Sequence, residues 1–225
     1  MWIWTWPISD IIENIGRVVP HCDRPAGLWR RLLHTELFWY IMMKRFSILV
    51  GDITHSHADA IVNAANVTLL GGSGVDGAIH AAAGPELLAE CRTLGGCETG
   101  QARLTAGYRL PAKHVLHTPG PIWRGGGQGE AALLASCYRS CLTLAEAHGL
   151  QSVDFSSIST GVYGYPLPQA ATVALKAIMD FLAEHDTPQQ VRMICHTRAA
   201  AEVYQQVWNQ WYAESKTDRI EIGYL

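Results

Sequence analysis

The amino-acid sequence predicts an α/β protein with a mostly parallel central sheet. Short apolar runs, typical of buried strands, alternate with longer segments whose apolar residues recur at helical spacing. The 225 residues are 48% hydrophobic and 16% charged, and the charged fraction is below the roughly 25% usual for globular domains. The sequence also holds 21 glycines. These numbers favour a compact fold with glycine-rich loops and exclude disorder as a global description.

The predicted strands are short. Residues 46–50 (FSILV) form the first, and Gly51 and Asp52 follow it as a turn. Residues 60–63 form the second strand, which is flanked by small and polar residues. Four more strands are expected at residues 102–106, 114–117, 152–155 and 191–195.

Helices are predicted between these strands. The first spans residues 75–83, and Pro85, at a first helical position, starts a second one that ends near Arg92. Residues 130–148 carry apolar side chains at helical spacing and end at Gly149, which is a C-cap signal. Two further helices are expected at about 169–185 and 199–212. This alternation is typical of an α/β sandwich with parallel central strands.

The first 42 residues differ in composition from the rest. They hold five of the eight tryptophans, namely Trp2, Trp4, Trp6, Trp29 and Trp39. We interpret residues 1–42 as an N-terminal extension of unclear role, or as an over-long start assignment. Residues 43–212 are then the folded domain, and residues 213–225, which carry mixed charges and no helical period, are a C-terminal tail.

Composition and charge exclude several classes of protein. No apolar run approaches the 18 residues of a transmembrane helix, and the N-terminus lacks a signal peptide, so we expect a cytoplasmic protein without a membrane span. The six cysteines form no CxxC pair, and none has a close histidine partner at a spacing suited to a metal site, so no metal site is expected. Residues 44–212 carry 11 Lys and Arg against 13 Asp and Glu without a basic run, so we expect no nucleic-acid surface.

Ligands of parallel sheets bind at the carboxyl ends of the strands, so the loops after Val50, Asn63 and Phe155 are the candidates for a site. In the first loop, Asp52 can accept hydrogen bonds from an amine or hydroxyl of a ligand. The simpler interpretation of Asp52 is a turn residue or a helix N-cap.

The second loop combines amides with glycines. Asn63 and Asn66 enclose two alanines at the strand end, and the glycines of residues 71–77 let the backbone approach a ligand. The helix that starts near Val75 directs free N–H groups at the same place. Three of these glycines match the G-x-G-x-x-G pattern, but the strand ends about eight residues earlier, which argues against a nicotinamide-dependent oxidoreductase.

Two further features invite a functional interpretation. Asp76 lies at the helix start, where the dipole stabilises a carboxylate by roughly 0.3–1 kcal/mol, so capping is its simpler role. Beside a phosphate the carboxylate would face a like charge, so its presence there would indicate a chemical role such as orienting water.

The third loop, residues 156–166, offers hydroxyls and backbone N–H groups to phosphate oxygens, and Tyr163 and Tyr165 offer an aromatic wall. Its simpler interpretation is a Gly-Pro turn under two packed tyrosines.

Four motifs in this order resemble the macrodomain family: residues 51–54 (GDIT), 62–66 (VNAAN), 71–80 (GGSGVDGAIH) and 158–166 (ISTGVYGYP). The resemblance covers residues 44–212. It is strongest to the MacroD-type branch of ADP-ribose-processing hydrolases, and within it to bacterial O-acetyl-ADP-ribose deacetylases. It implies a three-layer α/β/α sandwich with a mixed, largely parallel sheet, and ADP-ribose in a cleft at the strand ends. No cofactor or metal is implied, and we expect a monomer.

The resemblance also implies roles for single residues. Asp52 would hold the adenine amino group, helped by the backbone of Ile53. Asn66 would bind the hydroxyls of the distal ribose, Tyr163 would pack beside that ribose, and Asp76 would be the catalytic carboxylate. The diphosphate would be held by Gly74, Val75, Ser159, Thr160, Gly161 and Val162.

The chemistry of an ester on ribose agrees with these residue types. Water that attacks an ester needs a group to remove its proton, which Asp76 can do while Asn66 fixes the sugar. Nearby phosphates could raise the pKa of Asp76. O-acetyl-ADP-ribose and ADP-ribose on acidic side chains of proteins share the ester linkage, so the sequence leaves both substrates open. The alternatives are a module that binds ADP-ribose without hydrolysing it and a regulatory protein that acts through a partner or RNA.

The sequence departs from the family pattern in three places. Residues 117–121 (HTPGP) carry an additional proline, Pro119, which stiffens their loop. Ser73 stands where the branch commonly has glycine, which is a small change. His196, Thr197 and Arg198 stand where the family often has an aromatic and an acidic residue near the adenine, so the contacts at that end stay open. His80, His114 and His117 are acid–base candidates by type, and we interpret all three as structural.

Overall fold

The computed structural model describes residues 44–212 and 220–225. Seven strands form one sheet in the order β3-β4-β2-β5-β6-β1-β7. Every neighbouring pair is parallel except β3 and β4, which are antiparallel. The strands are β1 (Phe46–Val50), β2 (Ala60–Ala65), β3 (Arg103–Ala106), β4 (His114–Pro119), β5 (Ser152–Phe155), β6 (Gln190–Cys195) and β7 (Ile222–Tyr224).

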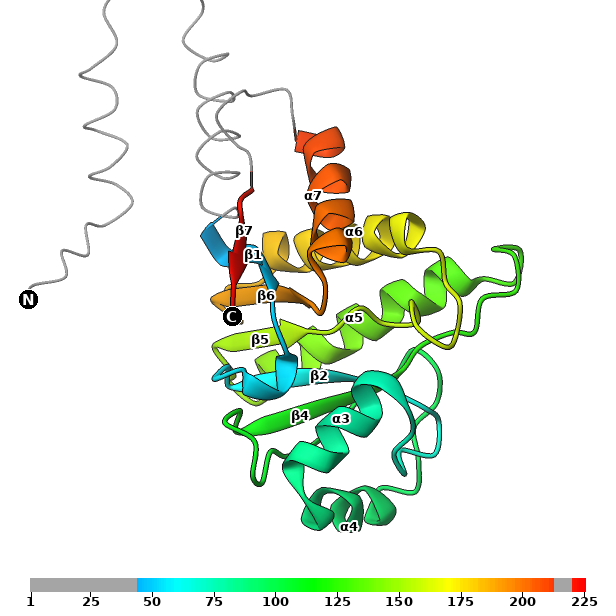
Figure 1. The fold of residues 1–225 in the computed structure, drawn as a ribbon, viewed down its shortest axis with the longest axis vertical. Coiled ribbons are helices and arrows are strands. Elements are labelled where there is room, and N and C mark those ends of the chain that lie inside the picture. The colour runs from blue at the N-terminus through cyan, green and yellow to red at the C-terminus, as the bar shows by residue number, and fades with distance from the viewer. Residues whose placement is uncertain (1–43, 213–219) are drawn as a thin grey trace, which may run out of the picture. The chain divides into compact units, whose positions relative to one another are not determined.

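Helices cover both faces of this sheet (Figure 1). One layer holds α3 and α4, and the other holds α5, α6 and α7, so the three-layer α/β/α sandwich and the mixed, largely parallel sheet are confirmed. A short 3-10 helix, η1 (Ile53–His55), follows β1. The α-helices are α3 (Gly74–Ala83), α4 (Pro85–Thr93), α5 (Glu130–Ala147), α6 (Leu167–Glu184) and α7 (Arg198–Tyr212).

Alternation along the strands divides their side chains between two cores. Ala60 and Val62 of β2 join the core under α5, α6 and α7, whereas Ile61 and Ala65 join the core under α3 and α4. Successive side chains of a strand point to opposite faces, so a strand buried on both faces is apolar along its length. Asn63, which is fully buried, interrupts this apolar pattern on the α3–α4 face.

The last strand, β7, was not predicted from the sequence. Within the expected tail, Ile222–Tyr224 forms β7, which pairs in parallel with β1 at the edge of the sheet. Leu225 then donates its backbone N–H to the carbonyl of Val50 at 3.0 Å. The proposed extension, residues 1–42, lies outside the described residues. No helix in the described part of the chain is long and apolar enough to cross a membrane.

Candidate active site

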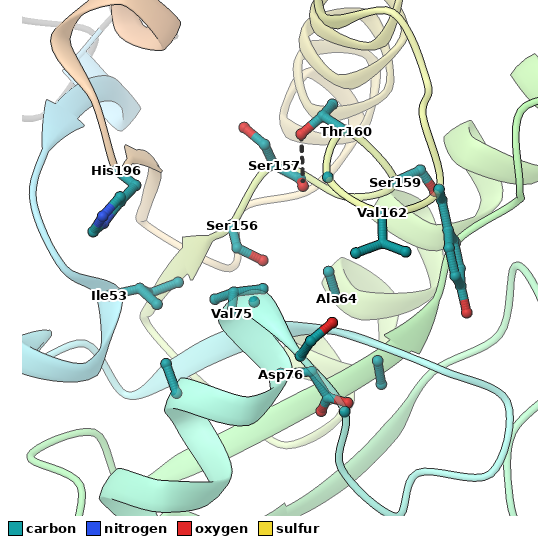
Figure 2. Close-up of a pocket in the computed structure, with 18 of the residues that line it drawn as sticks. Ile53, Ala64, Val75, Asp76, Ser156, Ser157, Ser159, Thr160, Val162 and His196 are labelled. Carbon is teal, nitrogen blue, oxygen red and sulfur yellow. Dashed lines mark hydrogen bonds between the residues drawn. The ribbon is translucent and has the colours of Figure 1, made fainter.

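A cleft of about 670 Å³ opens at the carboxyl ends of the parallel strands (Figure 2). Loops after β1, β2, β4, β5 and β6 contribute to it, together with the start of α3. The structure brings all eleven residues predicted for the site to this one cleft: Asp52, Ile53, Asn66, Gly74, Val75, Asp76, Ser159, Thr160, Gly161, Val162 and Tyr163. Their common position follows from the parallel sheet, because the carboxyl ends of such strands share one edge.

Ile53 and His196 lie on one side of the cleft (Figure 2), and Asp52, which precedes Ile53, also lines it. Asp52 caps η1: its Oδ1 accepts hydrogen bonds from the backbone N–H of Thr54 at 2.9 Å and from the Thr54 hydroxyl at 2.8 Å. The bond from the Thr54 backbone is the main reason that the pKa of Asp52 lies below its ordinary value. Asp52 is therefore a cap, as its simpler interpretation predicts, and an exposed carboxylate of the cleft wall.

The floor of the cleft is formed by the glycine-rich loop and the first turn of α3. Ser73 precedes the helix and makes no side-chain capping bond, so the N–H groups of the first turn face the cleft without a side-chain acceptor from Ser73. The loop packs closely on the helix, since a Cβ at Gly77 would lie 2.5 Å from the carbonyl oxygen of Gly72. Glycine at position 77 is therefore needed for this close approach.

The loop after β5 forms the opposite wall. Ser159 adopts a left-handed conformation with φ of 66°, and its buried hydroxyl has no hydrogen-bond partner among the described residues. The hydroxyl of Thr160 donates to the carbonyl of Ser157 at 3.2 Å, as Figure 2 shows. Val162 is 85% exposed at the rim. A strained residue with an unpaired hydroxyl in a cleft wall is typical of a ligand-binding loop.

The two tyrosines of this loop have different positions. Tyr163 lines the cleft, and its carbonyl accepts the backbone N–H of Trp123 at 2.9 Å. Tyr165 is buried and packs on the ring of Trp123, with the ring centroids 4.4 Å apart. Only Tyr163 thus supplies the aromatic wall that the sequence analysis expected from both.

Asp76 is the most buried carboxylate of the cleft, at 4% exposure. Its Oδ1 accepts a hydrogen bond from Asn63 Nδ2 at 2.7 Å and lies 3.5 Å from His80 Nε2. Burial, the largest cause, raises the pKa of Asp76, while the Asn63 hydrogen bond and the charge of His80 oppose that rise. The carboxylate is therefore easier to protonate than an exposed aspartate.

Asn66 already uses part of its amide within its own loop. Its Nδ2 donates to the carbonyl of Gly71 at 2.8 Å, and its Oδ1 accepts from the backbone N–H and the hydroxyl of Thr68 at 3.0 and 2.6 Å. A primary amide has two N–H donors, so one N–H remains for a ligand. A Cβ at Gly72 would lie 2.9 Å from Asp76 Oδ2 and 3.4 Å from Asn66 Nδ2, which shows that both side chains meet over this glycine.

Two lining residues, Gly120 and Ile194, were not predicted, whereas Ser156, Ser157 and His196 lie in segments that the sequence indicated without naming them as site residues. Gly120 follows β4, a fourth parallel strand whose loop the sequence analysis did not consider as a binding loop. Ser156 and Ser157 follow β5 in the same serine-rich loop as Ser159, so the residue pattern that indicated Ser159 applies to them as well. No Lys or Arg occurs among the described residues that line the cleft.

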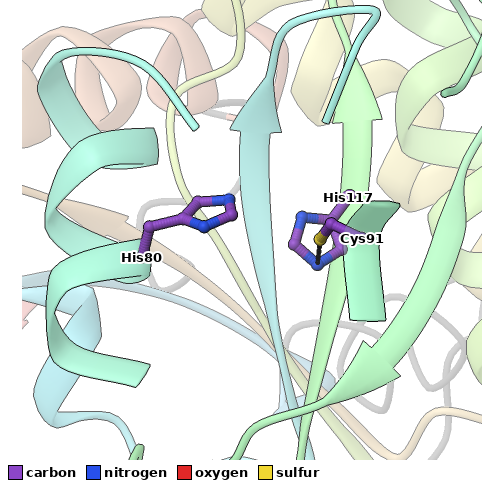
Figure 3. Close-up of side chains that lie close together, drawn as sticks. All are labelled: His80, Cys91 and His117. Atoms are coloured by element: carbon purple, nitrogen blue, oxygen red, sulfur yellow. Dashed lines mark hydrogen bonds between the residues drawn. The ribbon is translucent and has the colours of Figure 1, made fainter. Parts of the chain in front are cut away.

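A largely buried polar cluster lies behind Asp76 and was not predicted from the sequence. His80, Cys91 and His117 come from α3, α4 and β4, and their ligand atoms lie within 4.8 Å of one another, with His80 and Cys91 directed at His117 (Figure 3). By residue type they could hold a metal ion. The cysteine spacing could not reveal this group because the fold, not the chain, brings the three side chains together.

The fold and the cleft together define a class: an α/β protein whose cleft at the strand ends offers backbone N–H groups and hydroxyls, the donors that suit a phosphate-bearing ligand, beside a buried carboxylate. The chain belongs to the macro domain family, whose model matches residues 62–174. A macro domain-containing protein of Methanosarcina mazei is 53% identical over 68% of this chain and 82% of that protein. An O-acetyl-ADP-ribose deacetylase of Salmonella typhimurium is 50% identical over 75% of this chain and 97% of that protein.

Solved structures agree with this assignment. A mutant of the Oceanobacillus iheyensis macrodomain with ADPR has a TM-score of 0.72 at 44% identity, over 74% of this chain and 93% of that one. The Trypanosoma brucei macrodomain in complex with ADP-ribose has a TM-score of 0.68 at 47% identity, over 72% of this chain and 68% of that one.

Proposed function

We propose that the protein binds ADP-ribose derivatives and hydrolyses an acyl ester of their distal ribose. The observation that carries this proposal is Asp76: a buried carboxylate with a raised pKa, set where a phosphate-binding helix start meets Asn66. The family and the deacetylase named among its relatives support it.

The cleft supports one orientation of the ligand. Asp52 can accept a hydrogen bond from the adenine amino group through Oδ2, because its Oδ1 is occupied by Thr54. The first turn of α3 and residues 159–162 offer N–H groups and hydroxyls to the diphosphate. The distal ribose then reaches Asn66, Tyr163 and Asp76. His196 lies at the adenine end, where the family commonly has other residue types.

The proposed reaction uses water as the nucleophile. Asp76 takes a proton from the water as its oxygen bonds to the ester carbonyl carbon. The bond between that carbon and the ribose oxygen then breaks, and Asp76 returns the proton to the ribose oxygen. The products are a carboxylic acid and a ribose hydroxyl. The raised pKa of Asp76 suits this task, because a base with a pKa nearer the working pH binds and releases the proton more readily.

Two substrates share this chemistry, O-acetyl-ADP-ribose and a protein whose glutamate or aspartate carries ADP-ribose through an ester. We propose both as substrates of the one cleft. The acyl group is acetyl in the first substrate and the side-chain carboxyl group of a protein in the second.

A product assay with both substrates tests the proposal. The native chain is expected to release acetate and ADP-ribose respectively, and the Asp76→Ala and Asn66→Ala variants are expected to lose most of that turnover. Calorimetry with ADP-ribose gives the control, since the variants should still bind it. Binding without product in the native chain would leave only an ADP-ribose-binding module, and undiminished turnover in both variants would reject the assigned roles.

We also propose that residues 1–42 take no part in the reaction, because every described residue that lines the cleft lies between residues 51 and 196. A chain shortened to begin at Met43 is expected to fold and to hydrolyse the ester at the native rate. Loss of turnover or precipitation of the shortened chain would show that the extension is needed.

A further inference from the structure

The polar cluster behind Asp76 begins with two neighbouring strands. Asn63 of β2 and His117 of β4 are register partners in the parallel pair, and both side chains are fully buried. Asn63 Nδ2 lies 2.7 Å from Asp76 Oδ1 and 3.1 Å from His117 Nδ1. The amide of Asn63 therefore links the carboxylate to the imidazole.

The direction of each hydrogen bond follows from the chemistry of the groups. An ionised carboxylate only accepts, so the NH₂ group of Asn63, and not its carbonyl, faces Asp76. The second N–H of that group then points at His117 Nδ1, which must accept it and is unprotonated. The ring proton lies on Nε2, 2.9 Å from the hydroxyl of Thr105, and this hydroxyl in turn donates to the carbonyl of Ala106 at 3.2 Å.

We propose that His117 is a positioning residue, which acts through Asn63 to hold an N–H donor against the Asp76 carboxylate. The inference rests on the proposed function of Asp76 as the base. His117 itself does not touch the substrate, since it does not line the cleft.

The orientation of Asn63 needs such support. Its Oδ1 is buried without a hydrogen-bond partner among the described residues, which is a costly state for a carbonyl. A rotated amide would bring this oxygen against the carboxylate of Asp76, where two acceptors meet, and against the unprotonated Nδ1 of His117. Asp76 and His117 thus fix the same orientation from two sides.

The charge state of the ring keeps this support constant. Burial, with a smaller contribution from His80, lowers the pKa of His117 to about 3, so Nδ1 remains an acceptor at ordinary pH. The other groups that face the ring are the thiol of Cys91 from α4, at 3.8 Å from Nε2, and the hydroxyl of Thr105 from β3. Burial raises the pKa of Cys91 to about 11, so this neighbour is neutral as well.

A metal ion is the competing explanation for the cluster of His80, Cys91 and His117 (Figure 3). Zn²⁺ would need a thiolate and an unprotonated imidazole nitrogen. Coordination through Nε2 would remove the proton that this atom presents to Thr105. The metal and the hydrogen-bonded arrangement therefore make opposite predictions for the tautomer of His117.

The decisive comparison uses two replacements of equal shape, His117→Asn and His117→Leu. The asparagine oxygen can occupy the place of Nδ1 and accept from Asn63, whereas leucine cannot. Because the Asn63 hydrogen bond opposes the raised pKa of Asp76, His117→Leu should move the acidic limb of the kcat/KM profile to higher pH. It should also lower kcat by about 10- to 100-fold with little change in KM. His117→Asn should keep the native limb and a kcat within about threefold.

Two spectroscopic measurements test the role of His117 without relying on enzymatic activity, and a melting curve separates that role from a folding defect. Histidine ¹⁵N spectra of the native chain should show His117 with its proton on Nε2. Carboxyl ¹³C spectra should show a higher pKa for Asp76 in His117→Leu, and a smaller rise in Thr105→Val, even if no ester is hydrolysed. Thermal melting identifies a variant that does not fold, and Thr105→Val then supplies the comparison.

Three results would overturn the proposal: a proton on Nδ1, an unchanged pKa of Asp76 in His117→Leu and Thr105→Val, or one Zn²⁺ bound by the native chain and lost in Cys91→Ala. Cys91→Ala should otherwise leave the pH profile unchanged, because the positioning contact does not use the thiol. Absence of hydrolysis in the native chain would reject the proposed function alone.

Discussion

Two aspartates line different parts of one cleft and differ in almost every physical respect. Asp52 is exposed and is held by a backbone N–H and a hydroxyl, which lower its pKa. Asp76 is buried, and burial raises its pKa although Asn63 donates a hydrogen bond to it. The same side chain is thus kept ionised at one end and made ready to take up a proton at the other. Position in the fold, and not residue type, separates the binding role proposed for Asp52 from the catalytic role proposed for Asp76.

The largest effect should come from Asp76→Asn. The amide cannot remove a proton from water, so kcat is expected to fall by about 10²- to 10⁴-fold, the usual contribution of general acid–base catalysis. The amide oxygen can still accept from Asn63, so the fold should be retained. Turnover of O-acetyl-ADP-ribose measures the loss, and calorimetry should show nearly unchanged binding of ADP-ribose. An equal loss of binding would place Asp76 in ligand recognition instead.

The same replacement at the other end, Asp52→Asn, should have the opposite pattern. It removes a charged acceptor for the adenine amino group, so KM and the dissociation constant of ADP-ribose should rise about tenfold, as for one charge-assisted hydrogen bond. The value of kcat should stay close to native. Steady-state kinetics separate the two parameters, and a fall in kcat matching that of Asp76→Asn would remove the distinction between the two ends.

A methyl group can disturb the Asp76 end without changing any polar group. In Gly72→Ala, the new Cβ would lie 2.9 Å from Asp76 Oδ2 and 3.4 Å from Asn66 Nδ2, so one of them must move. We expect kcat to fall about three- to tenfold. Gly127→Ala is the matched control, because a Cβ there meets no atom within 4 Å and the residue lies outside the cleft. Equal kinetics of the two variants would contradict this geometry.

Ionisation of the two aspartates should change the free energy of unfolding with opposite signs as pH rises. The folded pKa of Asp76 is raised, so its ionisation disfavours the fold as pH rises from the ordinary value of 3.8 through the folded pKa. Asp76→Asn should therefore melt at a higher temperature than the native chain at pH 7. This gain should disappear at pH below 3.8.

Asp52 provides the contrasting case for the same measurement. Its folded pKa is lowered, so its contribution to stability is present above the ordinary pKa and is lost as pH falls through the folded one. Asp52→Asn should melt slightly below the native chain at pH 7, and the two should converge in acid. Melting curves across this pH range check both signs.

Much of the cleft could be predicted from the sequence because its parts are local. The pattern of residues 46–50 and 152–155 indicates buried strands, and the glycine- and serine-rich loops that follow them are unusual over a few residues. The strand ends of a parallel sheet then bring these loops together. The fold class and the place of Asp76 follow from that argument.

The remaining features depend on pairings that no local pattern contains. The contact between Asn63 and His117 joins residues 54 positions apart and requires the order and register of β2 and β4. The strand β7 has three residues and exists as a strand through its pairing with β1, so periodicity could not reveal it.

The lack of Lys and Arg among the described residues lining the cleft affects how the site responds to ionic strength. Neutral N–H and hydroxyl donors act over short range, so added salt should change the affinity for ADP-ribose little. The net charge of −3 slightly opposes an approaching anion, and salt that screens this repulsion should speed association. Inorganic phosphate, which offers charge without the shape of the nucleotide, should compete weakly. Such a cleft can stay available to its ligand in the presence of abundant simple anions.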